Sequence, residues 1–248
     1  MQVSRQSTKL ILVEPSGPLN IGSVARLCEN FGIKELRLVA PRCDPNNQEA
    51  RKMAIKGKRL LDDAKEYSCL LDAIADCSRV IATSGRIDHG TIPLCSTEEA
   101  IEWSLEASRK LPMALVFGRE DHGLTNEELL LAQKVITIET SSNYKSLNLS
   151  HAVAIVLNEL QRYESQILTK NTQPNNVEDP ASPRQINDCL NDAEDLLLQV
   201  GFLYQHTSKA RMSKIKALLQ RAVIQPEEVS LIRGILRQMR WAISNRNF

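Results

Sequence analysis

Three short segments of this sequence combine small residues with polar or charged ones, and each lies at or just before a stretch with helical character. They are residues 20–26, 118–123 and 146–150. Helix N-termini present free backbone N–H groups that suit polar or anionic ligands. Gly118 also lets the backbone approach a ligand closely, because no Cβ intervenes. Loops that follow separate parallel strands can meet in one crevice, so we expect a single ligand site.

Several common ligand and catalytic motifs are absent. The dinucleotide fingerprint G-x-G-x-x-G does not follow the first expected strand, and the sequence has neither a G-x-x-x-x-G-K-[ST] phosphate loop nor a G-x-S-x-G elbow. The six cysteines form no C-x-x-C pair and have no histidine at zinc spacing, so we expect no metal site. His122 and His151 are candidate acid–base groups, but a lone histidine is more often structural, and we assign neither a role.

The expected strands and helices that must position these segments alternate along the chain. This alternation predicts an α/β fold with a mostly parallel sheet. The expected strands are residues 9–13, 36–39, 79–83, 113–117 and 135–138. The expected helices are residues 20–30, 60–77 with a break near residue 67, 96–110, 126–133 and 149–169. Asn20 is a candidate cap for the first helix, and Thr125 with Glu128 forms a capping box. The polar stretch before Gly57 is interpreted as a variable surface segment.

The last third of the chain differs from the rest. Residues 171–183 are rich in Asn, Pro, Ser and Thr, which is typical of a linker. Beyond it, the pattern predicts three helices at residues 185–200, 209–223 and 226–244. We therefore expect one domain over residues 1–170, a linker over 171–183 and a small all-helical C-terminal extension over 184–248.

Charge is unevenly distributed, although the formal net charge of the chain is only +1. Residues 171–200 carry six acidic side chains and one basic one, whereas residues 201–248 carry nine Lys or Arg and two Glu. This asymmetry indicates either an anionic partner for the C-terminal helices or a solvated helix face. The candidate phosphate-binding cations are Lys209, Arg211, Lys214, Lys216 and Arg221, and Arg233, Arg237 and Arg240 could line another face.

The sequence has no pattern of a signal peptide, and no apolar run approaches the ~20 residues of a membrane span. The cysteines lie mostly within apolar patterns, as small buried hydrophobic residues do. We therefore expect a cytoplasmic protein with no membrane contact.

The three segments together resemble the ordered motifs of the SpoU–TrmH branch of the SPOUT RNA methyltransferases. The matching residues are Asn20-Ile-Gly-Ser-Val-Ala-Arg26, Phe117-Gly-Arg-Glu120 with Gly123-Leu124, and Ser146-Leu-Asn-Leu-Ser150. Their order and spacing match from about residue 9 to residue 160. Residues 123–128, 144–149 and 233–236 are most similar to the members of this family that 2′-O-methylate nucleotide 32 of the tRNA anticodon loop.

This resemblance implies a deep trefoil knot at the C-terminal end of the sheet domain, a homodimer with each site near the subunit interface, and S-adenosylmethionine as cofactor. It implies tRNA as substrate and an RNA-binding C-terminal extension. By motif match, the expected cofactor contacts are Thr83, Ser84, Gly85, Gly118, Ile138, Lys145, Ser146 and Leu147. Gly85 and the pair Asp121-His122 depart from what is usual in these enzymes.

The same resemblance selects the candidate catalytic-site residues, which are Arg26, Asn20, Glu120, Asn148 and Ser150. Arginine stays protonated in proteins, so we expect Arg26 to bind a phosphate and stabilise developing oxyanion charge rather than act as a base. Asn20 could cap its helix, contact RNA or do both, and Ser150 could orient the substrate or cap a helix. We expect Glu120 and Asn148 to hold the loops in register, without proton transfer by Glu120.

Two other functions remain open at this stage. An rRNA 2′-O-methyltransferase of the same family would contain the same three motifs, since these do not identify the RNA. A non-catalytic RNA-binding homologue could keep the fold, although the presence of Asn20, Arg26, Glu120 and Asn148 argues against it. The basic C-terminal helices could likewise serve oligomerisation instead of RNA binding.

Overall fold

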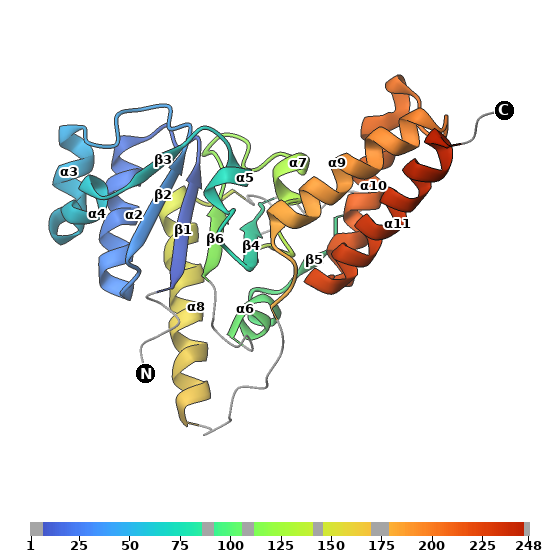
Figure 1. The fold of residues 1–248 in the computed structure, drawn as a ribbon. Coiled ribbons are helices and arrows are strands. Elements are labelled where there is room, and N and C mark those ends of the chain that lie inside the picture. Colours follow the sequence, from blue (N-terminus) through green and yellow to red (C-terminus); the bar gives the residue numbers. More distant parts are fainter. Residues whose placement is uncertain (1–6, 86–91, 106–111, 141–145, 170–178, 246–248) are drawn as a thin grey trace.

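A seven-stranded, entirely parallel sheet forms the centre of the molecule in the computed structural model, which describes residues 7–85, 92–105, 112–140, 146–169 and 179–245 (Figure 1). Its strand order is β3-β2-β1-β6-β4-β7-β5. The strands are β1 (Thr8–Val13), β2 (Glu35–Val39), β3 (Lys65–Tyr67), β4 (Arg79–Thr83), β5 (Leu94–Cys95), β6 (Met113–Phe117) and β7 (Lys134–Ile136). The predicted parallel α/β sheet is confirmed.

Helices cover both faces of this sheet. They are α2 (Pro18–Phe31), α3 (Gln48–Ala54), the 3₁₀ turn η1 (Ile55–Gly57), α4 (Lys58–Asp62), α5 (Leu70–Ala73), α6 (Thr97–Leu105), α7 (Asn126–Leu129) and α8 (Leu149–Thr169). Side chains on a strand alternate between faces, and the two core clusters follow this alternation. Leu10 and Leu12 pack with α2, α3, α4, α6 and α8, whereas Ile11 and Val13 pack with α5 and α7.

Three further helices follow: α9 (Pro183–Gln199), α10 (Gln205–Ala222) and α11 (Pro226–Ser244). They lie together at the end of the molecule opposite α3 and α4 (Figure 1). α10 docks on the sheet domain, because Ala217 enters the second core cluster and the buried Gln220 donates a hydrogen bond to the carbonyl of Leu129 at 3.1 Å. The helical extension is thus observed, while the division of the chain into independent domains stays a prediction.

Several local predictions were wrong. α2 begins at Pro18, with Gly17 before it, so Asn20 lies inside the first turn and does not cap the helix. Proline fits a first helical position because its missing N–H has no intrahelical acceptor there. The stretch expected to be a variable surface segment contains α3 and η1. The expected helix 60–77 is α4, the edge strand β3 and α5, and α7 ends at Leu129 instead of residue 133.

The expected trefoil knot and the expected lack of a membrane span concern the fold as a whole. The knot stays a prediction. Residues 141–145, which precede α8, lie outside the described part of the chain. Within the described ranges, none of the helices has the length and apolar character needed to cross a membrane.

Candidate active site

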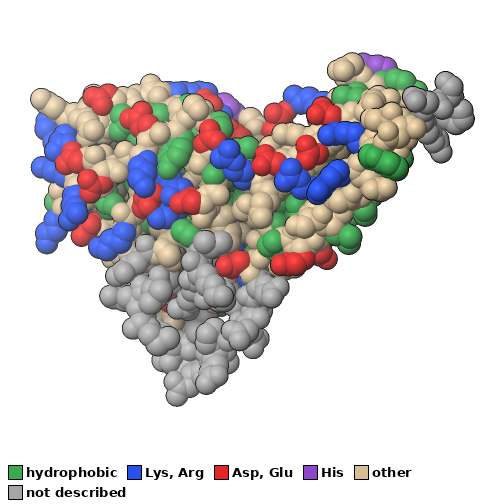
Figure 2. All heavy atoms as spheres, viewed as in Figure 1, with side chains coloured by type: hydrophobic (Ala, Val, Ile, Leu, Met, Phe, Trp, Pro, Cys, Tyr) green, Lys and Arg blue, Asp and Glu red, His purple; other side chains and the backbone are tan. Residues whose placement is uncertain are grey.

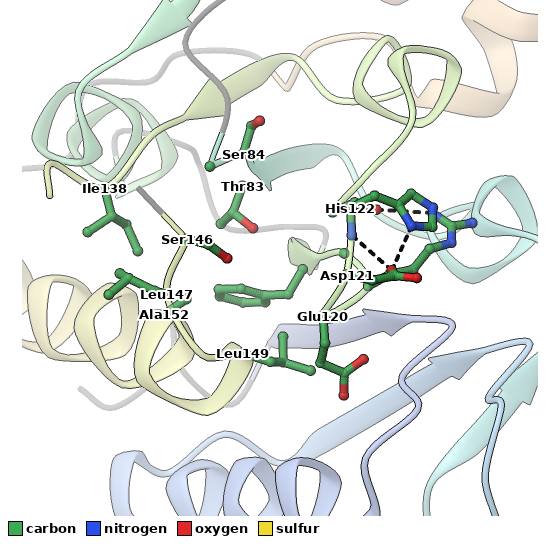
Figure 3. Close-up of a pocket in the computed structure, with 15 residues that line it drawn as sticks. Thr83, Ser84, Glu120, Asp121, His122, Ile138, Ser146, Leu147, Leu149 and Ala152 are labelled. Atoms are coloured by element: carbon green, nitrogen blue, oxygen red, sulfur yellow. Dashed lines mark hydrogen bonds and ion pairs between the residues drawn. The ribbon is translucent and has the colours of Figure 1, made fainter. Parts of the chain in front are cut away.

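The carboxyl ends of β4, β6 and β7 meet the start of α8 at a pocket of about 770 Å³. Seven of the eight expected cofactor contacts line it: Thr83, Ser84, Gly85, Gly118, Ile138, Ser146 and Leu147. The eighth, Lys145, lies outside the described residues. Figure 3 shows that residues from these separate strands and loops surround one space. The second and third motifs therefore converge on one pocket with the ends of β4 and β7, as expected for loops at one edge of a parallel sheet.

The other residues that line this pocket were not predicted as cofactor contacts. They are Phe117, Arg119, Asp121, His122, Gly123, Leu149 and Ala152, with Glu120 expected only as a catalytic-site residue. Phe117 ends a buried strand, and Leu149 and Ala152 belong to the apolar stripe of α8, so their pattern is that of core residues. Position in the sequence could have identified them, because four belong to the matching motifs and Asp121, His122 and Ala152 lie within two residues of one.

Gly118 is needed for the shape of its own loop. A Cβ at this position would lie 2.3 Å from the backbone carbon of Gly123 and 2.4 Å from the backbone nitrogen of Leu124. Such distances are far inside van der Waals contact, so no side chain fits without moving backbone. Gly123 has φ +69°, in the left-handed region that glycine adopts readily. The loop therefore folds back on itself beside the pocket because both positions are glycine.

Glu120 caps α2 from a distant segment of the chain. Its Oε1 accepts hydrogen bonds from the Gly17 N–H at 3.0 Å and from Asn20 Nδ2 at 3.1 Å, and its Oε2 accepts one from the Ser16 N–H at 3.0 Å. Burial alone would raise the pKa of Glu120, but these hydrogen bonds together lower it. A carboxylate at a helix N-terminus is also favoured by the helix dipole. Glu120 is therefore a fixed, ionised acceptor.

Asn20 connects this carboxylate to the third motif. Asn148 Nδ2 donates to Asn20 Oδ1 at 2.9 Å, and Asn148 Oδ1 accepts from the Ser150 N–H at 2.9 Å and from Ser150 Oγ at 2.7 Å. Four of the five candidate catalytic-site residues thus form one hydrogen-bonded chain from Glu120 to Ser150. Asn148, which directly precedes α8, caps it, and Ser150 lies within the first turn. We call this chain the amide relay. Glu120 lines the pocket, whereas Asn20, Asn148 and Ser150 do not, although Leu147 and Leu149 line it on either side of Asn148.

Arg119 ties the pocket loop to its surroundings. Its guanidinium donates to both oxygens of Glu128 at 2.8 and 3.0 Å and also to Glu14, and its side chain is nearly buried. The hydrogen bond from Arg119 is the main cause that lowers the pKa of Glu14 to about 2, with Arg42 adding to it against an opposing effect of burial. Glu128 is also the capping-box residue of α7, as the sequence predicted. Arg119 therefore joins β1, the pocket loop and α7.

The unusual pair Asp121-His122 lies at the edge of the pocket. His122 Nδ1 is 2.6 Å from Asp121 Oδ1, and Arg42 lies 3.6 Å from the other carboxylate oxygen. Both side chains of the pair are more than half exposed. Figure 3 shows them beside the pocket loop, on the side away from Ile138 and Leu147.

Arg26 is not brought into the pocket of its own chain. It is exposed on α2 and is absent from the pocket lining. Within the described residues, Asn20 joins the amide relay, whereas Arg26, six positions later in the first motif, has no hydrogen bond to it.

The expected RNA-binding cations of α10 differ in how free they are to bind a phosphate group. Lys209 pairs with Glu127 at 2.6 Å, and Arg211 donates to the Phe202 carbonyl at 2.8 Å. Lys216 is half-buried, and burial lowers the pKa of its ammonium group. Lys214 and Arg221 are exposed. The described residues contain no group of His, Cys, Asp and Glu that could hold a metal ion.

Comparison with known proteins gives matches along most of the chain. The model of the SpoU rRNA Methylase family matches residues 7–158, and the model of the tRNA methyltransferase TrmJ C-terminal domain matches residues 184–247. The tRNA (cytidine/uridine-2'-O-)-methyltransferase TrmJ of Escherichia coli K12 is 34% identical over 237 residues, which is 93% of this chain and 94% of that protein. The protein of the same name from Shigella sonnei gives the same values.

Solved structures agree with these matches. The crystal structure of TrmJ from Z. mobilis ZM4 has a TM-score of 0.81 and 29% identity, covering 94% of this chain and 99% of that one. A probable methylase family protein from Haemophilus influenzae has a TM-score of 0.63 and 29% identity, covering 98% and 99%. The family expected from the motifs is confirmed. With one family model over the sheet domain and the other over the last three helices, this chain belongs to the SpoU family of RNA methylases, as a TrmJ-type member.

Proposed function

We propose that the chain is an S-adenosylmethionine-dependent tRNA 2′-O-methyltransferase that acts on cytidine or uridine 32 of the anticodon loop as a cytoplasmic homodimer. The observation that carries the proposal is one pocket lined by residues of the second and third motifs, with the first motif hydrogen-bonded to both of them through Asn20. The named TrmJ relatives support tRNA as the substrate. The six free cysteines are compatible with a reducing compartment.

The pocket residues fit S-adenosylmethionine. A volume of about 770 Å³ lies within the range of small-molecule sites and suits a nucleoside-sized molecule. Phe117, Ile138 and Leu147 supply apolar walls for a ring, while Thr83 and Ser146 supply hydroxyl groups. The nearby carboxylates of Glu120 and Asp121 give the site a negative character that favours a cationic sulfonium. When bound, the cofactor supplies an activated methyl group.

The chain's own residues then have to position a ribose 2′-hydroxyl and stabilise its charge as the proton leaves it. Ser150 Oγ donates its hydrogen to Asn148, which leaves the Ser150 oxygen free to accept a hydrogen bond from the substrate hydroxyl. Asn20 and Asn148 hold each other and keep this serine in place. Because its pKa is lowered and its oxygens are occupied, Glu120 orients Asn20 and does not take the proton.

Arg26 has to reach the site from elsewhere. It does not line the pocket of its own chain, and a homodimer with each pocket near the subunit interface would let Arg26 of one protomer serve the pocket of its partner. There the guanidinium would bind the phosphate next to the target ribose and stabilise the developing oxyanion. Sedimentation of the purified protein tests this part of the proposal, because a monomer that remains fully active would contradict it.

The test of the whole proposal is a labelled-methyl assay on purified tRNA and rRNA, followed by nucleoside mapping. We expect label on the 2′-oxygen of nucleotide 32 in tRNA and none on rRNA. Calorimetry with S-adenosylmethionine accompanies the assay, because a protein that does not bind the cofactor would be a non-catalytic RNA-binding homologue. Label on rRNA alone would replace tRNA by rRNA as the substrate.

A further inference from the structure

A second cationic segment lies in the sheet domain, at the opposite end of the molecule from the C-terminal helices (Figure 1). Five of the nine residues from 51 to 59 are Lys or Arg, namely Arg51, Lys52, Lys56, Lys58 and Arg59. The structure folds this stretch into the end of α3, the turn η1 and the start of α4. Figure 2 shows Lys and Arg side chains gathered along the edge formed by α3 and α4, with acidic side chains among them.

Two glycines fix this segment against α2. A Cβ on Gly22 would lie 2.2 Å from the carbonyl oxygen of Ala50 in α3. A Cβ on Gly57, at the end of η1, would lie 2.4 Å from the carbonyl oxygen of Ala25 and 2.9 Å from the backbone nitrogen of Arg26. Backbone therefore touches backbone at both places, which only glycine permits. The turn that carries the lysines is held directly against the turn of α2 that carries Arg26.

The charges of this segment divide into two groups. Arg51 pairs with Asp62, and Arg59 pairs with Asp63 at 3.2 Å, so these two arginines are already neutralised. The remaining three, Lys52, Lys56 and Lys58, are exposed and have no ion pair within the described residues. Arg26, which is also exposed, adds a fourth cation from α2. Unpaired lysines that a rigid frame holds together attract phosphate groups without reading sequence.

The backbone of η1 is also strained at Ile55. Ile55 has φ +49°, in the left-handed region that a β-branched residue rarely adopts, and its side chain is 51% exposed. Met53 is exposed as well. Strained backbone of this kind persists only where the surrounding structure over-determines it, and it is frequent at binding sites. Apolar side chains beside free lysines suit a partner that offers both phosphates and the faces of sugars or bases.

We propose that η1 with the adjacent ends of α3 and α4 forms an RNA backbone-binding surface beside Arg26, which we call the η1 surface: Lys52, Met53, Ile55, Lys56 and Lys58. This inference rests on the proposed function, because the RNA is the tRNA substrate. The η1 surface holds phosphates near the target nucleotide, while the α10 cations at the other end of the molecule contact a separate part of the tRNA. One tRNA molecule thus contacts both the sheet domain, which carries the pocket, and the C-terminal extension.

The experiment compares K56E/K58E with the wild type in tRNA binding at several salt concentrations. We expect affinity to fall by about tenfold or more at low salt, and the slope of log K against log salt to decrease by about 1.5, since two phosphate contacts are lost. Lys56→Glu alone is matched with Lys34→Glu, which reverses an exposed cation between α2 and β2 that has no ion pair within the described ranges. The Lys34 variant should keep wild-type affinity within about twofold.

A neutral double variant and a measurement of cofactor affinity distinguish the possible outcomes. The neutral variant K56Q/K58Q should show the same decrease in slope with a smaller loss of affinity, and all variants should keep wild-type affinity for S-adenosylmethionine, because neither lysine lines the pocket. Unchanged tRNA affinity and slope in K56E/K58E would overturn the η1 surface and leave the proposed function intact. A wild type that neither binds nor methylates tRNA would overturn both.

Discussion

Asn20 Nδ2 and Glu120 Oε1 lie 3.1 Å apart, although 100 residues separate them in the sequence. The bond closes the N-terminal turn of α2 onto the loop after β6, and the amide relay extends it to α8. Three segments that follow different strands are thereby held together beside the pocket, which Glu120 lines.

Replacing Glu120 by Gln should weaken both folding and catalysis. Glutamine can accept at only one oxygen, and its NH₂ group would face either the N–H donor of Ser16 or those of Gly17 and Asn20. We expect a loss of about 1–2 kcal/mol in the free energy of unfolding, as for the loss of a helix cap, together with a fall in turnover. Urea unfolding and a labelled-methyl assay measure the two effects. Glu29→Gln, on the exposed side of the same helix, is the control and should change neither.

Replacing Arg26 by Lys should leave cofactor binding unchanged and lower turnover. Lysine keeps the charge but not the planar fork that can contact a phosphate and an oxyanion together. We expect kcat to fall by about 100-fold, as when one oxyanion-stabilising donor is removed. Steady-state kinetics and calorimetry with S-adenosylmethionine separate the two properties. Wild-type turnover in this variant would exclude a catalytic role for Arg26.

Replacing Gly118 by Ala should disrupt the pocket. The new Cβ would collide with the backbone of Gly123 and Leu124, neither of which can rotate away. We expect a loss of about 1–3 kcal/mol in the free energy of unfolding and a large drop in cofactor affinity. Thermal unfolding and calorimetry provide the measurements. The matched control is Gly234→Ala on α11, where nothing lies within 4 Å of an added Cβ, so helix propensity should make the protein slightly more stable.

Glu14 should make the free energy of unfolding depend on pH in the acid range. Its pKa falls from 4.5 to about 2 in the folded protein, chiefly because Arg119 donates a hydrogen bond to it. A carboxylate with a lowered folded pKa stabilises the protein fully above its unfolded pKa, and this contribution is lost as pH falls toward the folded value. The difference in free energy of unfolding between the wild type and Glu14→Gln should therefore be largest near pH 6 and shrink between pH 4.5 and 2.

Urea unfolding at pH 6, 4 and 3 on both proteins measures that difference. Glu35 and Asp76 also have pKa values lowered to about 2, so the variant itself will still lose stability in acid. Only the difference between the two proteins reports on Glu14. A difference that stays constant over this pH range would show that the ion pair with Arg119 contributes nothing.

The local sequence determined much of this protein. Apolar runs predicted β1, β2, β4 and β6 to within about a residue, because a strand buried on both faces must be continuously apolar. Thr125 and Glu128 predicted their capping box, since that interaction needs only residues three positions apart. The family resemblance predicted eight cofactor contacts, three of them (Gly118, Ser146 and Leu147) within the motifs, and the seven that the structure describes line the pocket.

The structural features that the local sequence did not predict depend on contacts between distant segments. β3, Lys65–Tyr67, is polar and short, and it is a strand only because β2 offers it an edge. The cap of α2 comes from Glu120 in place of Asn20, and nothing near Pro18 indicates this. Lys52 and Lys56 lie in the stretch expected to be a variable surface segment, and only the close packing of Gly57 on α2 places this stretch beside Arg26. Periodicity and capping act within a few residues, whereas hydrogen bonds and close packing across 30 to 100 residues exist only once the chain has folded.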